Sequence, residues 1–105
     1  MEKTGDLVPG GLVRVRYDLD RLSQCRGTQG GMPQWNITGH LRVDDAAEST
    51  FEVSRVEGAD RVSADAVLEV PAGRSLALWF TAGGRWGCHE ADDQGGAGYR
   101  FDLRP

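Results

Sequence analysis

The residues best suited to chemistry or binding gather in a glycine-rich segment, residues 83–98. It contains an indole, a thiol, an imidazole and several carboxylates. An exposed indole beside carboxylates and amides suits sugar recognition, because the flat ring stacks on the apolar face of a pyranose while polar groups bind its hydroxyls. The candidate ligand-binding residues are therefore Trp86, Trp79, Asp92, Asp93, Gln94 and Tyr99. The alternative is that Trp86 folds back and covers the end of the molecule.

The same segment offers weaker indications of a metal site. Glu90, Asp92 and Asp93 supply hard oxygen ligands suited to calcium, but their spacing does not match the EF-hand loop. Zinc sites need paired spacings such as CxxC or HxxxH, and none occurs among Cys25, His40, Cys88 and His89. We expect no metal ion and no cofactor.

Catalysis is less favoured than binding. Cys88 beside His89 pairs a thiol with a base, but adjacent residues of an extended chain point apart. His40 with Asp18 or Asp20 is another acid–base pair, although these positions are more simply explained as solvent-exposed. The sequence contains no GxSxG or HExxH motif and no phosphate-binding glycine loop. No residue is therefore assigned a catalytic role.

Short strands must position these side chains. Apolar and polar residues alternate in six segments, which indicates half-buried strands, over residues 12–22, 35–43, 51–58, 62–70, 76–80 and 99–103. Trp35 is in phase with the buried face of its segment. Trp79 is out of phase with Leu78 and Phe80, so it is expected on the outer face or beneath a loop. Six strands without covering helices predict an antiparallel sandwich or a small barrel.

Two connections, residues 23–34 and 83–98, are longer than most loops of small domains. Both follow odd-numbered strands, so they share one end of the molecule if every connection reverses the chain. Each carries one of the two cysteines, Cys25 and Cys88. A bridge between them would contribute about 4 kcal/mol in the chain-entropy model. A reducing cytoplasm would instead keep both thiols free, and the two alternatives stay open.

Length and charge limit the remaining possibilities. The 105 residues fit one domain, residues 1–105, in which residues 1–11 are a flexible or edge segment. The net charge of -4 and the lack of basic runs argue against nucleic acid and anionic membranes as partners. No apolar stretch resembles a signal peptide, which predicts a cytoplasmic protein, or a secreted or periplasmic one if the chain is a trimmed piece.

Several short motifs share the order and spacing of a known family. They are Val15-Arg16-Tyr17-Asp18, Cys25-Arg26-Gly27, Trp35-Asn36-Ile37-Thr38-Gly39, Leu78-Trp79-Phe80, Gly87-Cys88 and the ending from Asp92 to Phe101. Together, over residues 12–103, they resemble DUF6209, a family of small bacterial domains of unknown function. The resemblance implies that Cys25 and Cys88 lie close together.

The ending from Asp92 to Phe101 also resembles that of starch-binding carbohydrate-binding modules. Ala91, Gln94 and Gly98 differ from that pattern, which has an aromatic residue and two asparagines at these positions. The resemblance implies an immunoglobulin-like sandwich, here of about six to eight strands, and a glycan-binding ancestry.

We therefore predict an all-β protein, an antiparallel, immunoglobulin-like β-sandwich. We expect a non-catalytic binding or accessory module that recognises a glycan or small ligand at the loop end carrying Cys25 and Cys88. One alternative is a small β-fold enzyme acting on a hydrophobic metabolite, in an apolar pocket between the sheets lined by Trp79 and Tyr99. Another is a structural or assembly subunit that pairs through exposed sheet edges, and a homodimer stays open.

Overall fold

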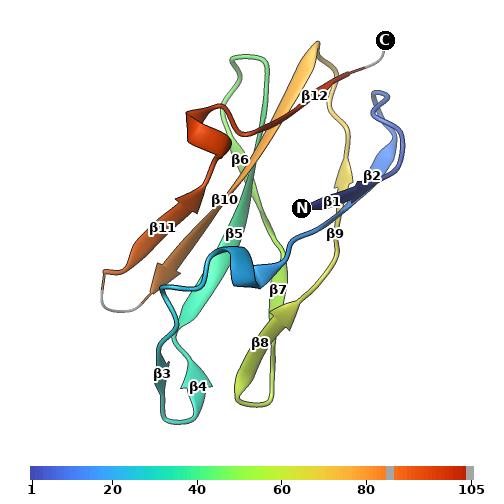
Figure 1. Ribbon diagram of the computed structural model, residues 1–105. Helices are drawn as coiled ribbons and strands as arrows, with labels where there is room; N and C mark the ends of the chain where they lie inside the picture. Colours follow the sequence, from blue (N-terminus) through green and yellow to red (C-terminus); the bar gives the residue numbers. More distant parts are fainter. Residues whose placement is uncertain (85–86, 104–105) are drawn as a thin grey trace.

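The computed structural model describes residues 1–84 and 87–103, which form strands joined by turns and two short 3-10 segments (Figure 1). In chain order the elements are β1 (Glu2–Thr4), β2 (Leu12–Arg16), η1 (Leu19–Arg21), β3 (Thr28–Gln29), β4 (Met32–Pro33), β5 (Trp35–Val43), β6 (Ser49–Glu52), β7 (Ser54–Glu57), β8 (Asp60–Ser63), β9 (Ala66–Glu69), β10 (Ser75–Gly84), β11 (His89–Asp92), η2 (Gln94–Gly96) and β12 (Tyr99–Asp102).

Two antiparallel sheets enclose the core in a sandwich-like arrangement (Figure 1). The large sheet has the order β11–β10–β5–β6, and β12 also pairs with β10. The small sheet has the order β1–β2–β9. The hairpins β3–β4 and β7–β8 extend from one end of the molecule. This arrangement confirms the predicted all-β antiparallel fold.

The alternation in the sequence determines which side chains fill the core. In β2, Val13 and Val15 are buried while Arg14 and Arg16 face the solvent. The buried set comes from both sheets and from the turns between them: Val13, Val15, Tyr17, Leu19, Leu22, Cys25, Trp35, Ile37, Leu41, Val43, Val53, Ala66, Val70, Leu76, Leu78, Phe80, Ala82 and Leu103. The buried position predicted for Trp35 is confirmed.

Three of the predicted strands are interrupted. The segment 12–22 is a strand only to Arg16, because the Asp18 carboxylate accepts the Asp20 N–H and turns the chain into η1. The segment 51–58 divides into β6 and β7 at the buried Val53, and 62–70 divides into β8 and β9. The bend after Arg16 takes the chain away from the small sheet. The two later bends take it from β6 of the large sheet, through the β7–β8 hairpin, to β9 of the small sheet. Alternation does not reveal the first bend, because Tyr17 and Leu19 beyond it are buried like Val13 and Val15 before it.

The two long connections are more ordered than predicted. Residues 23–34 contain the β3–β4 hairpin, and residues 83–98 contain the end of β10, β11 and η2. Residues 1–11 include the edge strand β1, which pairs with β2.

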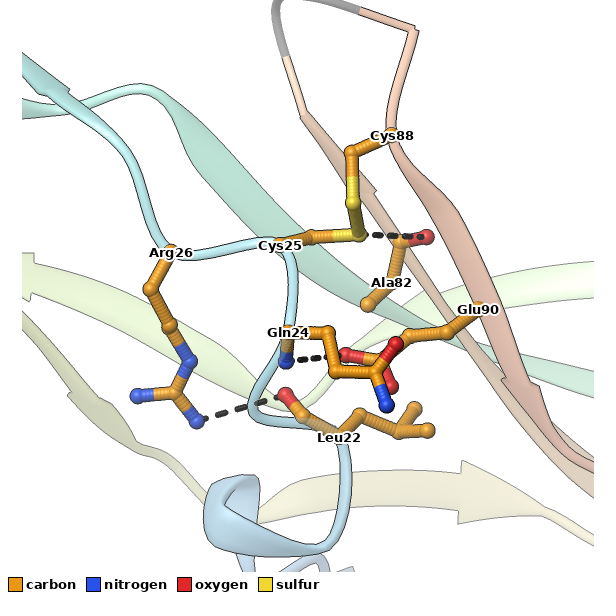
Figure 2. The surroundings of a disulfide bond; sticks show 7 residues. All are labelled: Leu22, Gln24, Cys25, Arg26, Ala82, Cys88 and Glu90. Carbon is orange, nitrogen blue, oxygen red and sulfur yellow. Dashed lines mark hydrogen bonds between the residues drawn. A yellow bond between two sulfur atoms is a disulfide. The ribbon is translucent and has the colours of Figure 1, made fainter.

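The predicted meeting of the cysteines is confirmed. Cys25 and Cys88 form a disulfide whose Cα atoms are 5.5 Å apart (Figure 2). Beside it, the Gln24 N–H donates to the Glu90 carboxylate at 2.7 Å, which joins the same two segments a second time. The disulfide therefore links the segment after η1 to the start of β11.

Candidate binding site

The outer face of the large sheet carries a partly exposed indole. Leu78 and Phe80 of β10 point into the core, so Trp79 between them points outward, as its phase predicted. Its cross-strand partner on β5 is His40, and the two rings stack with centroids 5.3 Å apart and planes 7° from parallel. Trp79 is therefore fixed against its neighbour on one side.

Two further side chains hold the imidazole of His40. Its Nδ1 lies 2.7 Å from Glu48 Oε2, and its Nε2 lies 2.8 Å from Thr81 Oγ1. Because the carboxylate only accepts, Nδ1–H donates to Glu48, and in the tautomer that carries its proton on Nδ1 the Nε2 atom accepts from the Thr81 hydroxyl. Both ring nitrogens of His40 are thus occupied, and the ring cannot turn freely away from Trp79.

A cleft lies on the other side of Trp79. Strand β11 ends at Asp92, paired with Phe80, and β12 begins at Tyr99, paired with Leu78. Between them the chain leaves the edge of β10 through η2, which places small residues beside the indole. The cleft has a volume of about 190 Å³ and is lined by Arg42, Asp44, Asp45, Ser75, Ala77, Trp79, Gly96, Ala97, Gly98 and Arg100.

Glycine is required at one of these positions. Gly98 has φ +76°, in the left-handed region, and a Cβ there would lie 2.9 Å from the Leu78 carbonyl oxygen. The Asp93 carboxylate accepts the Gly96 N–H at 3.2 Å and so shapes the preceding turn. Asp93 therefore builds the wall of the cleft and does not line it.

Asp44, at the far edge of the cleft, has a structural role. It follows β5 with φ 51°, and its carboxylate accepts the backbone N–H groups of Arg74 and Ser75 at 3.1 to 3.3 Å. These bonds tie the turn after β5 to the start of β10 and occupy the carboxylate. Asp45, the next residue, is exposed.

The remaining candidates come together around Asp92, at the boundary of the core. Its Oδ2 accepts hydrogen bonds from the Tyr17 hydroxyl at 2.6 Å, the Tyr99 hydroxyl at 2.7 Å and Arg21 Nε at 3.1 Å. Its Oδ1 accepts from Gln94 Nε2 at 3.0 Å. We call these five residues the Asp92 network. It joins β11 and η2 to β12, to Tyr17 after β2 and to Arg21 of η1.

The network also sets the charges of its members. Burial alone would raise the pKa of Asp92, but hydrogen bonds from Tyr17, Tyr99 and Arg21 lower it from 3.8 to about 2. Burial, and then the hydrogen bond to Asp92, raises the pKa of Tyr17 and of Tyr99. At neutral pH the carboxylate is ionised and both hydroxyls stay protonated. They act as a fixed acceptor and fixed donors, which suits a structural role.

The predicted site residues therefore fall into separate places. Asp92, Gln94 and Tyr99 belong to the Asp92 network, whereas Trp79 lies on the opposite face of the large sheet and lines the cleft. Trp79 and Tyr99 thus do not line one pocket between the sheets. Trp86 lies outside the described residues.

One protein-family model matches the chain over residues 1–105, that of a family of unknown function, DUF6209. The chain belongs to the DUF6209 family. The family resemblance of its short motifs is thereby confirmed. No curated protein and no solved structure matches the chain.

In this DUF6209 chain, sequence reasoning missed two members of the Asp92 network, Tyr17 and Arg21. A signal for Tyr17 was present, because a tyrosine in phase with core residues needs a buried partner for its hydroxyl. Arg21 gave no such signal.

Within residues 1–84 and 87–103, no three side chains of the metal-binding types gather to hold an ion. The same ranges contain no helix long and apolar enough to cross a membrane.

Proposed function

We propose that this chain is a non-catalytic binding module that holds one sugar ring of a glycan against Trp79. The observation that carries the proposal is a partly exposed indole lining a cleft of about 190 Å³ beside three small residues, Gly96, Ala97 and Gly98. The cleft is smaller than the pockets of about 300–1,000 Å³ that enclose drug-sized ligands, so a single ring suits it better. The apolar face of a pyranose stacks on an indole.

The surroundings of Trp79 favour this function. The contact with His40, which Glu48 and Thr81 hold in place, orders the indole before a ligand arrives, and preorganisation lowers the entropic cost of binding. The rim of the cleft supplies donors and acceptors for sugar hydroxyls. They are the Ser75 hydroxyl, the Asp45 carboxylate and the guanidinium groups of Arg42 and Arg100. The proposal includes the immunoglobulin-like architecture and glycan-binding ancestry that the ending from Asp92 to Phe101 implies.

The structure favours the sheet face over the loop end as the place of binding. Trp79 lies near the middle of β10, whereas Cys88 follows the end of that strand. Trp86 stays the candidate anchor at the loop end. The two tryptophans therefore define two competing sites, and each provides the control for the other.

Glycan-array binding, followed by fluorescence titration, tests the proposal. We expect Trp79→Ala to weaken binding at least about tenfold, because a stacking tryptophan is typically a main contributor to affinity. Trp86→Ala should leave the affinity unchanged. Filling the cleft with Ala97→Leu should also weaken binding. The opposite result, loss with Trp86→Ala and retention with Trp79→Ala, would place the site at the loop end. Silence across the array would contradict glycan binding.

A second candidate function is suggested by Glu48, His40 and Thr81. The Glu48 carboxylate contacts Nδ1 of His40, and Nε2 of His40 contacts the Thr81 hydroxyl. This is the order of groups found in hydrolase triads. In such a reaction Thr81 Oγ1 attacks an ester carbonyl while its proton passes to His40 Nε2, and the bond to the alcohol then breaks as the alcohol takes that proton. Water hydrolyses the acyl group left on Thr81 and restores the hydroxyl. Hydrolysis of p-nitrophenyl acetate that is lost in both His40→Gln and Thr81→Val would favour this function and contradict a non-catalytic module.

A further inference from the structure

Two arginines flank one small residue on the outer face of the large sheet. Ala77 of β10 pairs with Arg42 of β5 on one side and with Arg100 of β12 on the other. Residues in register on neighbouring strands project from the same face, so both guanidinium groups extend beside the methyl group of Ala77. Neighbouring strands are about 4.8 Å apart, which separates the two arginine backbones by about 10 Å. All three residues line the Trp79 cleft.

Neither guanidinium group is used by an ion pair in the described part of the chain. No carboxylate of residues 1–84 or 87–103 lies within 4.0 Å of Arg42 or Arg100, although five arginine–carboxylate pairs occur elsewhere in these residues. The nearby Asp44 carboxylate accepts backbone N–H groups instead. Asp44 and the exposed Asp45 also line the cleft, but neither forms an ion pair with Arg42 or Arg100. The space between the two guanidinium groups is therefore locally positive, which favours a bound anion.

Both arginine side chains are already partly positioned. Arg100 Nε donates to the Ala97 carbonyl at 3.1 Å, which holds its guanidinium group against the wall of the cleft. The Arg42 guanidinium carbon lies 5.7 Å from the centre of the Trp79 ring, within the range of a cation–π contact. The cleft therefore brings an indole and two guanidinium groups together, with Ala77 leaving space between the arginines.

We propose that the sugar bound in the Trp79 cleft is an acidic one, whose carboxylate lies between Arg42 and Arg100 above Ala77. The inference rests on the proposed function and adds the class of ligand. Arginine binds carboxylates through two parallel N–H donors, which gives geometric specificity as well as affinity. Ala77 and Trp79 are one strand repeat of about 7 Å apart, a separation that one ring with an acid substituent can bridge.

Calorimetric titration with a matched pair of sugars tests this inference. Oligomers of galacturonic acid provide the acidic ligand, and oligomers of galactose of the same length provide the neutral one. We expect the acidic oligomer to bind at least about tenfold more tightly, with an affinity that falls as salt is added. Arg42→Gln and Arg100→Gln should each lower the affinity for the acidic oligomer about tenfold more than they lower the affinity for the neutral one.

The control is Arg55→Gln, which removes an exposed guanidinium group on β7 that pairs with Glu57 at 2.8 Å. It changes the net charge equally and should leave both affinities unchanged. Melting curves verify that all variants fold. Titration with inorganic phosphate alone tests whether the cleft binds an anion that carries no sugar ring.

The possible outcomes distinguish the acidic-sugar inference from the proposed function. Equal binding of the two oligomers, unaffected by Arg42→Gln and Arg100→Gln, would overturn the acidic-sugar inference and leave the proposed function standing. Binding of phosphate that both variants abolish, without binding of either oligomer, would support the anion position but overturn the proposed function. No binding of any of the three probes would overturn both.

Discussion

At the scale of single residues, the Asp92 carboxylate accepts hydrogen bonds from four other side chains. One of its oxygens accepts from two tyrosine hydroxyls and one guanidinium group, and the other accepts from Gln94. The side chain is only 11% exposed, so these bonds replace water that the carboxylate would otherwise bind. The Tyr17 ring, fully buried, also stacks on Phe80 at 4.0 Å. Asp92 thus joins strands from both sheets through polar contacts at the boundary of the core.

The lowered pKa of Asp92 predicts a specific dependence of stability on pH. Its pKa is about 2 in the folded protein against an ordinary value of 3.8, so the folded state favours the ionised form. The stabilisation is fully present above the unfolded pKa and is lost as the pH falls through the folded one. Between about pH 5 and pH 2 this group should account for a loss of about 2 kcal/mol.

Urea unfolding of Asp92→Asn across this pH range measures the effect. The variant should be less stable than the natural chain at pH 6, because asparagine carries no charge to attract Arg21 and its amide nitrogen donates hydrogen bonds and cannot accept them. It should also lose less stability on acidification. The exposed Asp102→Asn serves as control and should retain the natural pH dependence. Parallel curves for Asp92→Asn and the natural chain would contradict the structural role of the network.

At the scale of elements, β10 organises the molecule. It pairs along its whole length with β5 on one edge and with β11 and then β12 on the other. The break between β11 and β12 creates the cleft at Trp79. On the inner face of the same sheet, Gly39 of β5 lies in register between Phe51 of β6 and Phe80 of β10. The two phenylalanine rings meet edge to face, with centroids 6.1 Å apart, above the glycine.

This row of three residues predicts that Gly39→Ala is strongly destabilising. A Cβ at position 39 would overlap the Phe51 ring, so the ring would have to leave its position against Phe80. Overpacking of this kind costs about 1–3 kcal/mol. Chemical denaturation measures the loss.

The matched control is Gly83→Ala, on the outer face of β10, where an added Cβ would have no neighbour within 4 Å. It should change the free energy of unfolding by less than about 0.5 kcal/mol, because it meets no clash and restricts the unfolded chain. Equal effects of the two substitutions would show that Phe51 moves aside without cost.

At the scale of the whole molecule, the disulfide joins segments far apart in the chain. Cys25 and Cys88 are 63 residues apart, and Cys25 is buried beneath the end of β10 while Cys88 is exposed. The bond encloses β3 to β10 in one covalent loop. In a chain of 105 residues, whose core is small, such a link is a large share of the net stability.

Reduction should therefore destabilise the protein markedly. The chain-entropy model gives a loss of about 4 kcal/mol for a loop of this length. Unfolding with and without dithiothreitol measures this loss. The double variant Cys25→Ser, Cys88→Ser should have the same free energy of unfolding as the reduced natural protein, and dithiothreitol should not change it. Thiol counting under denaturing, non-reducing conditions should find no free thiol. Two free thiols, or a stability that reductant leaves unchanged, would exclude the bridge.

The sequence by itself determined the fold class, most of the core and the meeting of the cysteines. Alternation in 12–16, 35–43 and 75–80 specified which side chains are buried, because successive residues of a strand face opposite sides. The same rule placed Trp79 outside and Trp35 inside. The proximity of Cys25 and Cys88 is predicted by counting chain reversals, which needs no knowledge of strand pairing.

Only the tertiary structure decided how the candidate residues combine. The sequence predicts that Asp92, Asp93, Gln94 and Tyr99 bind a ligand together with the tryptophans. In the structure Asp92 bonds to Tyr17, Asp93 caps η2, and the cleft at Trp79 forms on the other face of the sheet. Arg42, Ala77 and Arg100 become neighbours only through the registers of β5, β10 and β12. Spacing along a strand fixes the face on which a residue lies. Its neighbours across strands depend on the pairing of distant segments, which local sequence does not encode.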